Sequence, residues 1–505
     1  MNRTQKFALN STAAAITQIV AMVVGFITPR VMISTYGSEI NGLVSSLHQF
    51  ISYISLVEAG IGGAAIFSLY KPLAFKDHGK ISSIVSAARK SYRQAGYIFS
   101  TGIFILSLVY ALLCSTETLT FSTIFPLALL LGVNGCVSFF FTSGYRVLLT
   151  ADQRNYVISL TTIIQSVLRT VIVCLLAFWR VNVVALYAIA LAPIAVSCVI
   201  IYAYSKKNYS YVDKKAPADK SALNKRWDVI YQQILGTVQV GAPTVIATVI
   251  TDFFQISVFS VYNMVVNGVN GVLSIFITGL PAGFGELIAK GEEENLRKTV
   301  AEFEVAYYYL LSVIYGVTFV MLLPFVSIYT SGLTDVNYYN PILAIMIVLN
   351  GLLYNIKIPP SMLVVSAGMY KETRWRVTAQ GVIIVTAGTL LGLAFGIPGI
   401  MAGCCISNLY RTIDLLFFVP KNITHTKAFS TGWRMLLVLL NIALIVLPSL
   451  FISVTPASYL QWVLWAIGFT LYAIAVTSIT TSLFDKKHFK QVLLRFKNLL
   501  FKKRG

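Results

Sequence analysis

The sequence predicts an all-α polytopic membrane protein with about 14 transmembrane helices and both termini in the cytoplasm. Of its 505 residues, 57% are hydrophobic and only 11% are charged, and the apolar residues gather into fourteen long stretches. A bilayer core needs roughly 20 apolar residues per helix, whereas about 25% of the residues of a soluble domain are charged. The composition therefore excludes an ordinary soluble fold.

Each apolar stretch is long enough to cross a bilayer, and a short polar gap separates it from the next. The predicted spans are 9–33, 41–70, 94–114, 120–149, 156–178, 183–204, 229–250, 255–288, 303–328, 341–366, 377–395, 399–420, 433–452 and 460–482. The first is too long for a signal-peptide core, so we expect a retained helix. The second, fourth and eighth are longer than a bilayer requires, so we expect them to be tilted or to extend beyond it.

The distribution of lysine and arginine predicts the orientation. Thirty-four of the 39 lie in or beside the N-terminus, the alternate gaps and the tail, and only Arg30 and Arg180 belong to the opposite side. The other three, Arg169, Lys357 and Arg411, fall inside spans. Because basic loops face the cytoplasm, we expect this side to be cytoplasmic. The net charge of +20 then reflects membrane topology and not nucleic-acid binding.

Two halves of the chain, about 215 residues apart, share one hydropathy pattern. An even number of helices per half gives a parallel pseudo-repeat of two six-helix lobes, followed by two further helices. The predicted domains are a first lobe (1–204), a basic cytoplasmic linker (205–228), a second lobe (229–420), two additional helices (421–484) and a basic amphipathic tail (485–505). We expect the tail to bind anionic membrane lipid.

Charged residues inside spans are costly and therefore mark candidate sites. The candidate substrate-binding residues are Arg30, Glu58, Arg169, Lys357 and Arg411. The four cations outnumber the two anions, Glu58 and Asp414, and such a cavity attracts an anion; arginine suits phosphate or diphosphate. Structural roles are open for two of them, because Arg30 can extend to the headgroups and Arg411 can pair with Asp414 on one helix face.

Amides, prolines and glycines complete the intramembrane pattern. Pro359 and Pro360 interrupt helical hydrogen bonding beside Lys357 and form a candidate hinge. Gly388, Gly392 and Gly396 recur every four residues, which indicates close helix packing. Amides within the spans indicate either a polar cavity or interhelical hydrogen bonds: Gln18, Gln49, Asn134, Gln165, Gln239, Asn263, Asn267, Asn270, Asn350 and Asn355.

No pattern indicates an enzyme. The sequence has no phosphate-binding GxxxxGK[ST] motif, its four histidines are scattered, and its six cysteines form no CxxC pair. We therefore expect no catalytic residues, no cofactor and no metal ligands.

The opening stretch, NSTAAAITQIVAMVVGFITPRVMISTYGSEINGLVSSLHQFISYISLVEAGIGGAAIFSLYKPL, resembles bacterial polysaccharide transporters. In particular it is similar to the O-antigen and capsule repeat-unit flippases of the multidrug/oligosaccharidyl-lipid/polysaccharide exporter superfamily. The matching elements are the ITPR end of the first helix, the YG…NGL entry to the second, and the EAGIGGA stretch. Arg30 and Glu58 lie within the match, and the plan of two lobes plus two helices covers the whole chain.

This resemblance implies a flippase that moves a polyprenyl-diphosphate-linked oligosaccharide from the inner to the outer leaflet by alternating access. In this interpretation arginines hold the diphosphate, amides and aromatic residues hold the sugar, and Glu58 balances a cation or carries a coupling proton. The resemblance implies a bacterial cytoplasmic membrane and, as partners, the glycosyltransferases or polymerase of the same pathway.

Three alternatives stay open at this point. A lipid II flippase fits fourteen spans and cationic lobes. A cation-coupled multidrug exporter of the same superfamily favours an acidic cavity, opposite in sign to this one. A non-transporting scaffold of a glycan-assembly complex requires the deep charges to pair with one another.

Overall fold

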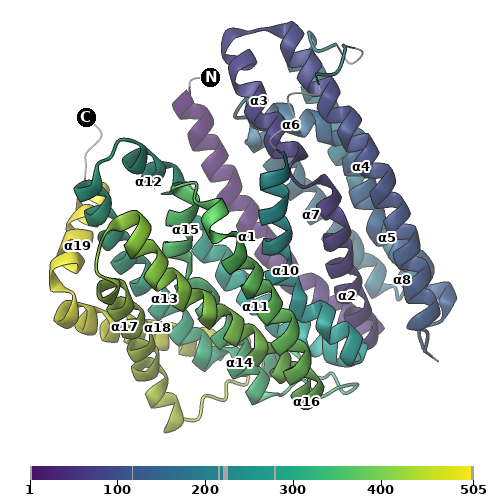
Figure 1. Cartoon of the computed structure of the whole chain (residues 1–505). Coiled ribbons are helices and arrows are strands. Elements are labelled where there is room, and N and C mark those ends of the chain that lie inside the picture. The colour runs from purple at the N-terminus through teal and green to yellow at the C-terminus, as the bar shows by residue number, and fades with distance from the viewer. Residues whose placement is uncertain (1–2, 117, 214–215, 220–225, 278–279, 502–505) are drawn as a thin grey trace. The chain divides into compact units, whose positions relative to one another are not determined.

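The computed structural model describes residues 3–116, 118–213, 216–219, 226–277 and 280–501. Over these residues every regular element is a helix, which confirms the all-α prediction (Figure 1). The chain forms two compact units. Unit 1 comprises Met1–Thr248 and Asp252–Ser257, and unit 2 comprises Val249–Thr251 and Val258–Gly505.

Unit 1 contains ten α-helices and two short irregular turns of helix among the described residues. They are α1 (Arg3–Tyr36), α2 (Ser38–Ile54), the 3₁₀ turn η1 (Ser55–Glu58), α3 (Ile61–Phe75), α4 (His78–Leu113), α5 (Phe121–Val137), the π-helical turn η2 (Ser138–Thr142), α6 (Ser143–Ala151), α7 (Asn155–Phe178), α8 (Val183–Ile189), α9 (Ala192–Asn208) and most of α10 (Arg226–Ile250). The helix α1 lies along α7, and α4 packs against α3, α5 and α6.

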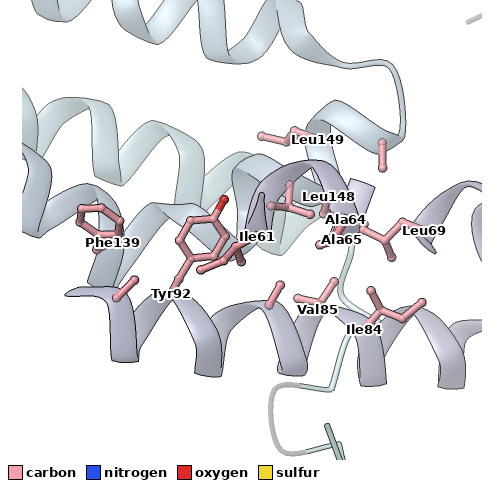
Figure 2. Packing of buried hydrophobic residues seen from close by; sticks show 14 of the residues in the cluster. Ile61, Ala64, Ala65, Leu69, Ile84, Val85, Tyr92, Phe139, Leu148 and Leu149 are labelled. Atoms are coloured by element: carbon pink, nitrogen blue, oxygen red, sulfur yellow. The ribbon is translucent and has the colours of Figure 1, made fainter. Parts of the chain in front are cut away.

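The core of unit 1 surrounds the first half of α4. Ile84, Val85 and Tyr92 of α4 face Ala65 and Leu69 of α3, as Figure 2 shows. These side chains recur at helical spacing on one face of α4, so the pattern that makes the helix amphipathic also makes the core. This packing fixes the position of the residues between α2 and α3.

Unit 2 is built around the long helix α13. Its helices are α11 (Phe253–Ile277, of which the first turn belongs to unit 1), α12 (Leu280–Ala289), α13 (Glu293–Tyr329), α14 (Pro341–Ile356), α15 (Ile358–Ser366), α16 (Tyr370–Val419), the π-helical turn η4 (Pro420–Thr424), α17 (Ala428–Val446), the 3₁₀ turn η5 (Leu447–Leu450), α18 (Tyr459–Phe484) and α19 (Lys486–Phe501). The helix α13 packs against α12, α14, α17, α18 and α19.

The described helices agree with the predicted spans, but several spans are broken. Twelve helices are long and apolar enough to cross a membrane, and α2 and α3 form a thirteenth span bent by 41°. The predicted span 41–70 is therefore a broken helix and not a single tilted one. The break lies at Gly60, whose positive φ of 78° only glycine adopts without strain.

The helix α16 is two antiparallel arms. Gly396 has φ 64° and ψ −147°, which no helix contains, and Gly388 of the first arm lies directly against Gly403 of the second. Counted separately, the arms raise the number of spans to the fourteen predicted from sequence. Gly388 packs as the glycine pattern predicts, whereas Gly396 makes the turn; for Gly396 the packing prediction is wrong.

Helix starts confirm the internal repeat. The helices α2, α4 and α7 begin at Ser38, His78 and Asn155, and α11, α13 and α16 begin 215 residues later at Phe253, Glu293 and Tyr370.

The boundary between the compact units lies at residues 248–258, beyond the predicted linker 205–228, because α10 contacts α2 through Gly241 and Thr248. The finer division into five domains stays a prediction.

The described part of the predicted amphipathic tail forms α19 and contacts unit 2. Phe489 stacks on Tyr309 of α13 with ring centroids 5.7 Å apart, and Arg495 Nε lies 2.7 Å from Glu302 Oε2. Residues 502–505 lie outside the described residues. Part of the face that the sequence assigns to lipid is thus used for protein packing, and lipid binding by the tail stays a prediction.

We expect Gly403→Ala to destabilise the protein, because a Cβ atom there meets the backbone of Gly388. Overpacking of this kind costs about 1–3 kcal/mol. Gly468→Ala is the matched control, since a Cβ atom on that glycine of α18 meets nothing. The check is thermal unfolding in detergent; equal melting temperatures for the two variants would contradict the close contact between the arms.

Candidate functional site

The break between α14 and α15 places Lys357 in the interior of unit 2. Lys357 ends α14, and Pro359 and Pro360 occupy the first turn of α15, where their missing N–H groups are least costly. The carbonyl of Ile356 accepts a 3.0 Å hydrogen bond from the Tyr308 hydroxyl of α13, replacing the backbone donor that Pro360 lacks. The two prolines thus interrupt the helix as predicted, and their role as a hinge stays a prediction.

Lys357 is 5% exposed and contacts polar and aromatic groups. Its Nζ donates to Asn408 Oδ1 at 2.6 Å and lies 4.8 Å from the centre of the Tyr354 ring. Asn408 Nδ2 donates to Asn350 Oδ1 at 2.9 Å, and Gln380 Nε2 lies 3.3 Å from the same Asn408 oxygen that accepts from the lysine. An ammonium group is therefore held among amides that can rearrange around an anion.

A second amide cluster joins α14 to α11 and α13. Asn355 Nδ2 donates to Asn270 Oδ1 at 2.7 Å and to the Gly351 carbonyl at 2.8 Å, and its Oδ1 accepts from the Tyr307 hydroxyl at 3.1 Å. Tyr315 also donates to Asn270, at 2.9 Å. These amides form interhelical hydrogen bonds, the structural alternative that the sequence left open. We name Lys357, Asn350, Asn355, Gln380 and Asn408 the unit 2 polar core.

Arg411 is paired. It contacts Asp414 one turn later on α16, and the same carboxylate also contacts Arg376. The three groups together carry one positive charge. Arg411 also lies close enough to Lys357 for the two charges to repel each other. The structure thus brings Arg411 to the edge of the unit 2 polar core, where Asp414 largely compensates its positive charge.

Arg30 and Arg169 lie on adjacent helices of unit 1. The helices α1 and α7 run in parallel, and the hydroxyls of Thr28 and Thr170 are 3.5 Å apart beside the two arginines. Arg169 interacts electrostatically with His48 of α2 and Tyr187 of α8. Both arginines therefore belong to one region of unit 1, which their sequence separation did not reveal.

Glu58 ends the 3₁₀ turn between α2 and α3. It interacts electrostatically with Arg146 of α6 and Tyr92 of α4. The Nε of Arg146 is buried and has no hydrogen-bond partner among the described residues. Sequence reasoning missed Arg146, because it lies at the basic end of a predicted span and is counted with the neighbouring gap. Glu58 thus faces a cation within its own unit.

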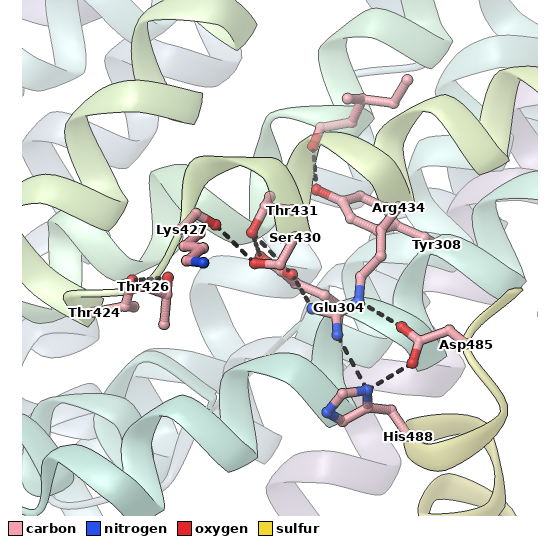
Figure 3. Close-up of polar contacts among 11 residues, drawn as sticks. Glu304, Tyr308, Thr424, Thr426, Lys427, Ser430, Thr431, Arg434, Asp485 and His488 are labelled. Atoms are coloured by element: carbon pink, nitrogen blue, oxygen red, sulfur yellow. Dashed lines mark hydrogen bonds and ion pairs between the residues drawn. The ribbon is translucent and has the colours of Figure 1, made fainter.

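Glu304, Arg434 and Asp485 form a buried ion network in unit 2 (Figure 3). Arg434 Nη1 donates to Glu304 Oε2 and Arg434 Nε donates to Asp485 Oδ2, both at 2.8 Å. Thr431 donates to Glu304 at 3.0 Å. Sequence reasoning missed this network because Glu304 and Arg434 fall one residue inside predicted spans, where charges are assigned to the flanking loops.

The network borders a cavity of about 490 Å³ between α13, α15, α16, α17 and α19. Arg297, Lys298, Lys487 and His488 line it together with Glu294. Over the described part of the chain, no group of three histidine, cysteine, aspartate or glutamate side chains is arranged to hold a metal ion.

Solved structures with the same fold are membrane transporters. An inward-facing multidrug resistance MATE family transporter of the MOP superfamily aligns with a TM-score of 0.67 and 12% identity, over 82% of this chain and 98% of that one. A lipid II flippase, MurJ in an inward closed conformation, aligns with a TM-score of 0.63 and 13% identity, over 94% and 98% of the two chains. The MATE transporter VcmN of Vibrio cholerae, in its bent form, aligns with a TM-score of 0.56 and 12% identity, over 88% of this chain and 99% of that one.

No protein-family model matches the sequence, and no curated protein is similar to it. The likeness therefore defines the fold: a multi-pass membrane protein with the architecture shared by MATE transporters and MurJ. The neighbours themselves are described as transporters and as a flippase.

We expect Asp485→Asn to lower stability at neutral pH by about 1–2 kcal/mol, the value of hydrogen bonds to a charged group. Burial by itself raises the pKa of Asp485, but hydrogen bonds from Arg434 and His488 outweigh it and hold the pKa below its usual value. The stabilisation is therefore complete above about pH 3.9 and is lost as the pH falls through the lowered pKa.

The measurement is the melting temperature in detergent between pH 3 and pH 7. The difference in melting temperature between wild type and Asp485→Asn should become smaller toward pH 3. The control Glu372→Gln removes an exposed carboxylate, and its melting temperature should stay close to that of the wild type at every pH. A gap that is constant with pH would contradict a charged Asp485 as the source of the stabilisation.

Proposed function

We propose that this chain is a flippase that moves a polyprenyl-diphosphate-linked oligosaccharide repeat unit across the cytoplasmic membrane of a bacterium, for surface polysaccharide synthesis. The observation that carries the proposal is the unit 2 polar core, in which a buried lysine lies among amides at a helix break. A cation of this kind suits a diphosphate, and amides suit sugar hydroxyls.

The interior charges of unit 1 also sum to a positive charge, since Arg30, Arg146 and Arg169 outnumber Glu58. Arg30 and Arg169 lie at one level of the neighbouring helices α1 and α7, and Glu58 interacts electrostatically with Arg146. In the proposed mechanism Lys357 is the diphosphate ligand of unit 2 and the arginines are the candidate anion ligands of unit 1, while the amides bind the sugar and the lipid tail stays in the bilayer. The two units act as the lobes of an alternating-access cycle, with the break at Pro359 and Pro360 as a hinge and both termini in the cytoplasm.

The fold neighbours support a transporter of this superfamily, and one of them is described as a lipid II flippase. Lipid II is the nearest alternative substrate. The glycosyltransferases or polymerase of the same pathway are the proposed protein partners, and anionic lipid is the proposed partner of α19.

A cation-coupled multidrug exporter is the second candidate, favoured by the fold likeness to MATE transporters. The interior charges argue against it. An arginine faces Glu58, and Asp414 is shared by Arg411 and Arg376, so neither carboxylate is available to attract a cationic drug. A scaffold without transport is the remaining alternative, and it requires the deep charges to pair with one another, as Arg411 and Asp414 do.

We expect Lys357→Met to lower surface glycan at least tenfold in a strain that lacks its own repeat-unit flippase and is complemented by this chain. Loss of one charged hydrogen-bond donor costs about 1.5–3 kcal/mol, and about 1.4 kcal/mol is a factor of ten. Lys357→Arg, which keeps the charge, should retain most activity. The measurement is surface glycan per cell at matched expression.

Lys371→Met is the matched control, because it removes an exposed lysine from the start of α16. Full export by Lys357→Met would remove Lys357 from the binding site. Failure of the wild type to complement, together with raised resistance to cationic drugs, would replace the flippase by the exporter. A wild type that neither restores surface glycan nor raises drug resistance would favour the scaffold.

A further inference from the structure

One side of α4 carries three cations together. Arg89, Lys90 and Arg93 lie on one stripe of the helix, at positions i, i+1 and i+4. The ion pairs described within unit 1 involve Lys6, Lys80 and Arg154, so no described carboxylate lies within ion-pair distance of the three. Like charges one helical turn apart repel, and an anion between them would remove that cost.

These cations line a groove of about 290 Å³ at the π-helical turn that follows α5. Ser86, Phe139, Phe140, Phe141, Ser143 and Gly144 form the rest of its lining. Gly144 lies directly under the aliphatic part of Arg89, and a larger side chain there would displace the arginine. The groove therefore has a defined floor and is more than a set of surface charges. We name it the α4 groove.

The position of the α4 groove matches the edge of a bilayer. The helix α4 has 36 residues, which is about 54 Å at roughly 1.5 Å per residue, whereas a hydrocarbon core is roughly 30 Å thick. No residue from Gln94 to Leu113 is charged, and these twenty residues alone cross the core. Arg93 lies immediately outside them, at the level of lipid phosphates.

Apolar side chains continue from the groove into the membrane. Tyr97 and Ile98, one turn beyond Arg93, are both 59% exposed, and Phe141 is 70% exposed. The rings of Tyr97 and Phe140 contact each other with centroids 5.3 Å apart. A ligand that fits both parts has an anionic head and an apolar tail.

We propose that the α4 groove binds the phosphate headgroup of an anionic phospholipid, with Arg89, Lys90 and Arg93 around the phosphate and the acyl chains along Tyr97, Ile98 and Phe141. This site belongs to unit 1 and does not depend on which substrate is carried. The bound lipid would anchor unit 1 to the leaflet that contains anionic phospholipid and would set the depth of α4 in the membrane.

The test uses the purified full chain in mild detergent, with native mass spectrometry to count bound phosphatidylglycerol and phosphatidylcholine. Each basic residue near a lipid surface contributes roughly fivefold in affinity, so R89Q/K90Q/R93Q should weaken phosphatidylglycerol binding on the order of 100-fold. The control K71Q/K206Q/K207Q removes three exposed charges from elsewhere on unit 1 and should bind as the wild type does.

Two further measurements keep the result decisive. If the triple variant does not fold, Arg93→Gln alone, at an exposed position, should weaken binding about fivefold. A photoreactive phosphatidylglycerol should label residues 86–98 or 138–146 of the wild type. Equal binding by wild type and the groove variants, labelling elsewhere, or no preference over phosphatidylcholine would overturn the proposal. Displacement of the lipid by equimolar inorganic phosphate would reassign the groove to a soluble anion.

Discussion

The structure depends on one constraint: within hydrocarbon, every backbone polar group and every charge must find its partner inside the protein. Where α14 breaks, Tyr308 supplies the hydrogen bond that Pro360 cannot donate. Where Arg434 is buried, Glu304 and Asp485 both contact it. The helix α13 contributes Glu302, Glu304 and Tyr308, so it satisfies groups on three neighbouring helices, α14, α17 and α19, and organises unit 2.

The same constraint explains why the interior charges are not equivalent. Arg411 and Arg434 form ion pairs with carboxylates, and these ion pairs stabilise the packing of unit 2. Lys357 rests on neutral amides and an aromatic ring, contacts that can be exchanged at lower cost than an ion pair. A transporter has to release its substrate, and a cation held by exchangeable contacts suits that task. The proposed substrate-binding cation Lys357 thus differs from the paired arginines in the partners described and not in its depth.

Both halves contain broken helices that carry an ionisable residue, at different positions of the repeat. The break between α2 and α3 carries Glu58, and the break between α14 and α15 carries Lys357. Each exposes backbone groups and places an ionisable side chain beside them, in a part of the fold where straight helices would offer only apolar surface. The proposed lipid site has another basis: at the end of α4 the bilayer itself changes from hydrocarbon to headgroup, and the sequence changes from apolar to basic at the same level.

The sequence by itself determined the class of fold, the number of spans and the 215-residue repeat, because span length and hydropathy follow directly from bilayer thickness. It also identified Lys357 and Glu58, since charges deep in apolar stretches are visible without coordinates. Only the tertiary structure decided that Gly396 turns one helix into two arms, that Arg411 is neutralised by Asp414, and that Arg146 and Arg434 are interior residues. These depend on backbone dihedral angles and on side-chain partners from distant segments, which hydropathy does not encode.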